Sequence, residues 1–129
     1  MKIYIAASFE QREEVKEAHE RVIAAGYQIT LDWTTHKSLK SSPKTNKLYE
    51  DYATSDVKGV IDADAYILLL GPRASTGAHI ELGVAIGSNK KHIIIVGDIQ
   101  EFTLFYKHPK IIHMPTLDDA IKYLSKTNA

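Results

Sequence analysis

The chain of 129 residues contains no cysteine, which excludes disulfides, thiol catalysis and thiolate-bound zinc or iron–sulfur sites. It has no excess of either charge, since 16 basic side chains balance 16 acidic ones, and this argues against a protein that holds nucleic acid by its phosphates. No apolar run approaches the ~20 residues that cross a bilayer. The start, MKIYIAASFEQREE, turns acidic too soon for a signal peptide. We therefore expect a small cytoplasmic protein without nucleic-acid or membrane partners.

What is present is typical of a globular protein. Apolar residues make up 44% and charged residues 25%, enough for a single domain over residues 1–129 with one core. Strand-like and helix-like hydrophobic patterns alternate along the chain. The predicted strands lie near 2–7, 27–33, 65–70, 91–96 and 110–113, the predicted helices near 10–25, 47–62, 78–88, 98–108 (a short one) and 116–124, and a polar loop covers 34–46.

Two of these strands indicate the fold class. AYILLL (65–70) and KHIIIVG (91–97) show no polar alternation, which is typical of parallel strands buried on both faces. Five strands alternating with about five helices predict an α/β fold, a doubly wound five-stranded parallel sheet in a flavodoxin-like, Rossmann-like three-layer sandwich with strand order 2-1-3-4-5. Such sheets bind ligands beyond the carboxyl ends of their strands. The exits to examine are therefore 7–9, 32–33 and 71–77.

The segment GPRASTGAHIELG (71–83) links the third strand to a helix. Free backbone N–H groups at a helix start form an anion site, so Ser75, Thr76 and the N–H groups near Gly77 could hold a phosphate or a sugar hydroxyl. A simple Ser/Thr helix cap is an equally weighted interpretation. The segment matches neither the Walker loop nor the Gly-x-Gly-x-x-Gly dinucleotide pattern.

Two carboxylates are candidate catalytic groups. Glu81 lies one turn into that helix among apolar residues, a partly shielded setting suited to a nucleophile or an acid/base; the alternative is an acid that only complements the helix dipole. Asp56, taken alone, is more simply a solvated helix acid. Tyr4, Phe9 and Trp33 lie near the first two strands, and one of them could stack on a planar ligand. The six histidines lack ligand spacing with carboxylates, so no metal site is expected.

Three segments carry a resemblance to a known family. KIYIAASF, DVKGVIDADAYILLL and GAHIELGVAIGSNKKHIII resemble the first strand, the Asp-containing segment before the third strand, and the Glu-Leu-Gly helix of the nucleoside 2-deoxyribosyltransferase-like family. That family includes the 2′-deoxynucleoside 5′-phosphate N-hydrolases. The likeness covers nearly the whole chain except 34–46.

The resemblance implies roles for individual residues. Glu81 matches the glutamate that attacks the anomeric carbon, Asp56 the aspartate that orients it or transfers a proton to the base, and Tyr4 a tyrosine near the sugar. Ser75 stands where the hydrolases of the family place a serine facing a phosphate. This favours a 5′-monophosphate, with Ser8 and Arg73 as further contacts.

The implied reaction is cleavage of the N-glycosidic bond of a (deoxy)nucleoside or its 5′-monophosphate, by hydrolysis or by transfer to another base, without a cofactor. The alternative is a non-catalytic nucleotide-binding or sensing module on the same fold, and the presence of both Glu81 and Asp56 counts against it. The apolar character of 80–86, with Tyr49 and Tyr52, further suggests a homodimer or a higher homo-oligomer.

Overall fold

The computed structural model describes residues 1–36, 46–98 and 102–127. Its strands are β1 (Lys2–Ala6), β2 (Gln28–Ile29), β3 (Ala65–Leu69), β4 (His92–Val96) and β5 (Ile111–Met114). Its α-helices are α1 (Arg12–Ala24), α2 (Asn46–Asp62), α3 (Thr76–Gly87) and α4 (Leu117–Thr127). Three short 3₁₀ helices are η1 (Phe9–Gln11), η2 (Trp33–Thr35) and η3 (Leu104–Lys107). Among these described helices, none has the length and apolar character that crossing a membrane requires.

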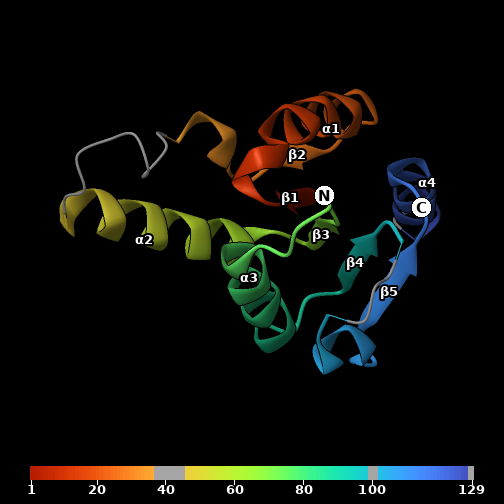
Figure 1. The fold of residues 1–129 in the computed structure, drawn as a ribbon. Coiled ribbons are helices and arrows are strands. Elements are labelled where there is room, and N and C mark those ends of the chain that lie inside the picture. The colour runs from red at the N-terminus through yellow and green to blue at the C-terminus, as the bar shows by residue number, and fades with distance from the viewer. Residues whose placement is uncertain (37–45, 99–101, 128–129) are drawn as a thin grey trace.

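The strands form one parallel sheet in the order β2-β1-β3-β4-β5, so the predicted α/β class and strand order are confirmed. Helices α1 and α4 cover one face, and α2 and α3 cover the other (Figure 1). In the register of the two central strands, Tyr4 pairs with Tyr66. Paired residues of adjacent strands point to the same face, so both tyrosines can reach the same covering helix.

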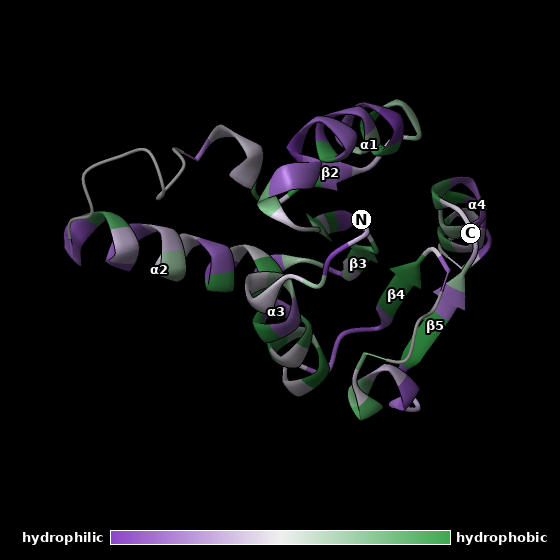
Figure 2. Ribbon diagram, viewed as in Figure 1, coloured by the Kyte–Doolittle hydropathy of each residue, from purple (hydrophilic) through white to green (hydrophobic). Residues whose placement is uncertain are grey.

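The core lies on both sides of β3 and β4, where every residue is buried. Figure 2 shows β4 as a continuous hydrophobic arrow, whereas α1 carries hydrophilic residues on its outward side. Helices on both faces remove the sheet from water, which is why these strands lack polar alternation. Gly26, with φ +97°, ends α1 in the left-handed conformation expected of a helix-terminating glycine.

Two predicted elements are shorter than expected. The second strand spans only Gln28–Ile29, because side chains beyond it bond to backbone and turn the chain away: Thr30 Oγ1 donates to the Gly59 carbonyl at 2.7 Å, and Asp32 Oδ1 accepts from Thr34 N at 3.0 Å. The short helix expected in 98–108 is η3 alone within the described part of that segment. The loop expected over 34–46 falls mostly on 37–45, outside the described residues.

Candidate active site

The candidate site lies where β1 and β3 end side by side. After β1 the chain passes to α1 on one face, and after β3 it passes to α3 on the other. This divergence is the topological switch point at which open α/β sheets bind ligands. Ser8, Arg73 and Ser75 line a narrow slot there, with a volume of about 20 Å³.

Glu81 is held by a tyrosine from the sheet. Tyr4, fully buried in β1, donates its hydroxyl to Glu81 Oε2 at 2.7 Å. Tyr66 lies parallel to Tyr4, with ring centroids 6.0 Å apart, and donates to the Ala78 carbonyl at 2.8 Å. Two neighbouring strands therefore fix the first turns of α3, and with them the carboxylate.

Burial raises the pKa of Glu81 from 4.5 to about 7; the hydrogen bond from Tyr4 lowers it, and the nearby Asp56 raises it. Burial, together with the adjacent Glu81, also raises the pKa of Tyr4 far above its ordinary value, so the phenol remains a donor. A carboxyl with a pKa near 7 changes its charge in the range where acid, base and nucleophilic groups operate.

Asp56 reaches this site from α2, and it is not the solvated acid that its sequence position alone suggested. Its Oδ1 is buried and has no hydrogen-bond partner among the described residues. Burial raises the pKa of Asp56, and His36 opposes that shift. The His36 Nδ1 lies 3.8 Å from Oδ1, and its ring stacks on Tyr52 with centroids 3.9 Å apart. Asp56 Oδ1 thus accepts no hydrogen bond among the described residues, and its nearest charged neighbour is His36.

The loop before α3 caps its helix. Ser75 is the N-cap, and its Oγ accepts from Ala78 N at 3.2 Å. Thr76 and Gly77 are exposed in the first turn. Arg73 is exposed and lies 3.7 Å from Glu10. Only Arg73 and Ser75 of this set line the narrow slot.

The two aromatic candidates lie together beyond β1. Trp33 is buried, and its indole N–H donates to the Ile5 carbonyl at 2.7 Å. Phe9 is half-buried, with its ring 6.4 Å from that of Trp33. Trp33 is therefore a packed core ring, and Phe9 is the more accessible of the two.

The structure thus brings Tyr4, Asp56 and Glu81 to one place. Two residues that contact this site were not predicted from the sequence, His36 and Gln11. Gln11 carries a recognisable signal, since Ser8 and Gln11 fit the Ser-x-x-Gln capping pattern. His36 carries none. Among the described residues no group of three or more His, Asp or Glu is placed to hold a metal ion.

An open parallel sheet with a buried carboxylate at its switch point is the architecture of an enzyme acting on a small molecule. The sequence model described as nucleoside 2-deoxyribosyltransferase matches residues 3–121, and the chain belongs to that family. It is therefore an enzyme of nucleoside chemistry, acting on the bond between sugar and base.

Solved structures of similar fold cover nearly the whole chain. A CMP N-glycosidase, BcmB, from Clostridium botulinum has 18% identity and a TM-score of 0.60, covering 98% of this chain and 99% of its own. A 2-deoxyribosyltransferase from Bacillus psychrosaccharolyticus has 19% identity and a TM-score of 0.75, covering 98% and 95%. A conserved protein from Enterococcus faecalis V583 has 15% identity and a TM-score of 0.69, covering 98% of each chain. No curated protein sequence matches the chain.

Proposed function

We propose that this enzyme cleaves the N-glycosidic bond of a (deoxy)nucleoside or of its 5′-monophosphate with Glu81 as the nucleophile. One observation carries the proposal: the Tyr4 hydroxyl lies 2.7 Å from a carboxylate whose pKa is about 7, at the ligand-binding edge of the sheet. Near pH 7 such a carboxyl populates both protonation states. The neutral form is compatible with an apolar setting, and the charged form can attack carbon.

In the proposed reaction, a Glu81 oxygen bonds to C1′ of the sugar while the bond from C1′ to the base nitrogen breaks. The bonding electrons leave with the base, which takes up a proton, and the transition state resembles an oxocarbenium ion. Tyr4 holds Glu81 in line for this attack. A second nucleophile at C1′ then releases the glycosyl group and restores the carboxylate. Water gives hydrolysis, and another base gives transfer.

Asp56 serves the departing base in this scheme. Its buried Oδ1, which has no hydrogen bond among the described residues, can accept one from the base, or Asp56 can carry the proton that the base needs, since its pKa is raised. This role can be separated from that of Glu81. A substrate whose base leaves readily needs little help from Asp56, but it still needs the attack on C1′ by Glu81.

The test is incubation of the purified protein with a panel of deoxynucleosides and their monophosphates, with free base detected by chromatography. Wild type is expected to release base. Glu81→Gln is expected to lose that release by several orders of magnitude. Glu20→Gln, at an exposed glutamate of α1, is the matched control and keeps full activity. Adding a second base distinguishes transfer from hydrolysis. Ligand binding without base release in wild type would establish the sensing module instead.

We also propose that the enzyme works as a homo-oligomer, in the cytoplasm. Helices α2 and α3 pack together and expose large apolar side chains, including Ile61 (52% exposed) and Ile80 (62% exposed). The first turns of α2 project away from the sheet (Figure 1) and carry the exposed Tyr49. A second copy of the chain is the simplest partner for such a face.

A further inference from the structure

In the proposed reaction the slot lined by Ser8, Arg73 and Ser75 would take the 5′ end of the substrate, and we call it the 5′ subsite; the side chain of Gln11 lies in it. Gln11 is buried at the end of η1 and lines the slot together with Ser8, Arg73 and Ser75. Its amide lies against the backbone of Gly71: a Cβ built on that glycine would be 2.5 Å from Gln11 Oε1. The absence of a side chain at position 71 is therefore what allows the amide to fill this space.

Gln11 also uses the donors that a ligand oxygen needs. Both the backbone N–H and the hydroxyl of Ser8 donate to Gln11 Oε1, each at 3.1 Å. The amide oxygen thus takes both donors that Ser8 would offer to an oxygen at the 5′ end of the substrate. The slot that is left, about 20 Å³, is the size of roughly one water molecule, which is enough for a hydroxyl and too small for a phosphate.

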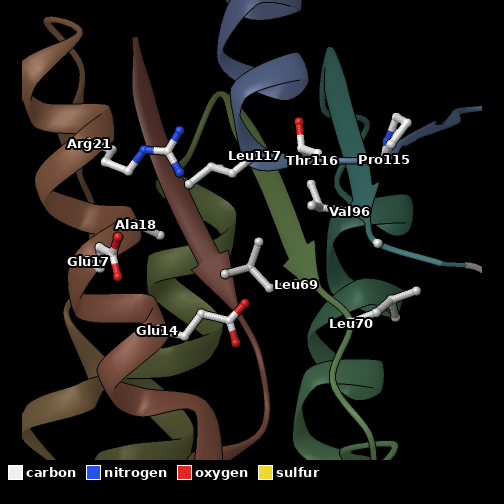
Figure 3. A pocket seen from close by; sticks show the side chains of 11 residues that line it. Glu14, Glu17, Ala18, Arg21, Leu69, Leu70, Val96, Pro115, Thr116 and Leu117 are labelled. Atoms are coloured by element: carbon white, nitrogen blue, oxygen red, sulfur yellow. The ribbon is translucent and has the colours of Figure 1, made fainter.

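The amide nitrogen of Gln11 bonds toward a second, larger cavity. Gln11 Nε2 donates to Glu14 Oε2 at 3.1 Å and to the Leu69 carbonyl at 3.4 Å. Glu14 and Leu69 line a cavity of about 310 Å³ between α1 and α4, and Leu69 and Leu70 line both this cavity and the 5′ subsite. Figure 3 shows Glu14 and Leu69 facing each other at the edge of the larger cavity. Gln11 thus lines the smaller space and bonds to two residues that line the larger one.

From this geometry we infer that Gln11 is a specificity-determining residue, which sets whether the substrate carries a 5′-hydroxyl or a 5′-phosphate. With the amide in the slot, both Ser8 donors are hydrogen-bonded within the protein. A phosphate then lacks both the space and the hydrogen-bond donors that it needs. With the amide removed, the two Ser8 donors and the nearby Arg73 become available to a dianion. The inference rests on the proposed function and identifies the part of the substrate that its site discriminates.

Two variants test it in opposite directions, with specificity constants measured for a deoxynucleoside and its monophosphate. Gln11→Ala opens the slot, and the ratio of monophosphate to nucleoside is expected to rise at least ~10-fold, the equivalent of one good hydrogen bond to a charged group. Gln11→Glu keeps an oxygen for Ser8 but adds negative charge, and the ratio is expected to fall. Gln28→Ala, at an exposed glutamine of β2, is the control and leaves the ratio unchanged.

Opposite shifts of the ratio also distinguish a change in specificity from a loss of folding. Misfolding would lower the specificity constants for both substrates together in either variant. The inference is overturned if the ratio stays constant in both variants, or moves the same way in both. Failure of the proposed function shows itself differently, as no base release from either substrate by wild type. In that case calorimetric titration with deoxynucleoside and monophosphate still compares the Gln11 variants, with the same expected directions for the dissociation constants.

Discussion

Replacing Glu81 by glutamine is expected to stabilise the folded protein at alkaline pH even as it abolishes activity. The pKa of Glu81 rises from 4.5 to about 7 on folding, mainly through burial, so the folded state binds this proton more tightly than the unfolded chain. A protein with such a carboxyl loses folding stability as the pH rises from the pKa of the unfolded chain to the pKa of the folded state. The loss develops between pH 4.5 and about 7 and then remains constant.

The size of the effect follows from that interval. At ~1.4 kcal/mol per pH unit, the distance between the two pKa values corresponds to about 3 kcal/mol. Glutamine keeps the shape of the side chain and an oxygen that accepts from Tyr4, but it carries no charge at any pH. Wild type and Glu81→Gln are therefore expected to have similar unfolding free energies near pH 4.5, and to differ by up to ~3 kcal/mol in favour of the variant at pH 8.5.

Urea unfolding at the two pH values measures this difference, provided that the slope of the free energy with denaturant is unchanged. Glu20→Gln, at an exposed position on α1, is the control and is expected to follow wild type at both pH values. A stability difference between Glu81→Gln and wild type that is the same at pH 4.5 and pH 8.5 would refute the reasoning, because it would show that Glu81 titrates alike in the folded and unfolded chain.

Three further predictions concern the same region. The acid limb of the pH–rate profile is expected near pH 7. Its pKa is expected to rise in Tyr4→Phe, which removes a hydrogen bond that lowers the pKa of Glu81, and to fall in Asp56→Asn, which removes a charge that raises it. A shift in the same direction in both variants would contradict this. Gly59→Ala is expected to cost ~1–3 kcal/mol and reduce turnover, because its Cβ would lie 2.9 Å from Leu31 Cβ and 3.1 Å from the Tyr4 ring. Gly83→Ala, with nothing within 4 Å, is expected to gain up to ~1 kcal/mol in thermal unfolding. Ile80→Lys is expected to give monomers by sedimentation, and a wild type that is already monomeric at micromolar concentration would remove the oligomer from consideration.

The sheet could be predicted because β3 and β4 are almost entirely apolar, with His92 at the start of β4 as the one polar residue. In β3 and β4 each residue is buried, and only two-sided burial produces such a run. The end of β2 could not be placed from sequence, since it depends on Thr30 reaching the carbonyl of Gly59, 29 positions away. A polar side chain at a strand end gives no sign of which backbone group it will find.

That Glu81, Asp56 and Tyr4 belong together was an expectation from the sequence, and the structure places them together, but their electrostatics could not be read from the sequence. Glu81 follows from its place after a strand and a turn-rich loop. The Tyr4 bond that tunes it joins residues 77 positions apart, and the pKa depends on burial that only the fold creates. His36 was absent from the sequence-based prediction because its stacking on Tyr52 and its approach to Asp56 arise from a loop and a helix that meet only in three dimensions.

The paired tyrosines have a consequence for how this site can change over time. Tyr4 and Tyr66 tie the early turns of α3 to the two central strands through Glu81 Oε2 and the Ala78 carbonyl, without using the loop 71–75. Substitutions in that loop that keep the Ser75 cap are therefore expected to leave the Glu81 carboxylate in position, because its support comes from a buried sheet. The same sheet could therefore accept different substrates during evolution while the position of Glu81 stays the same.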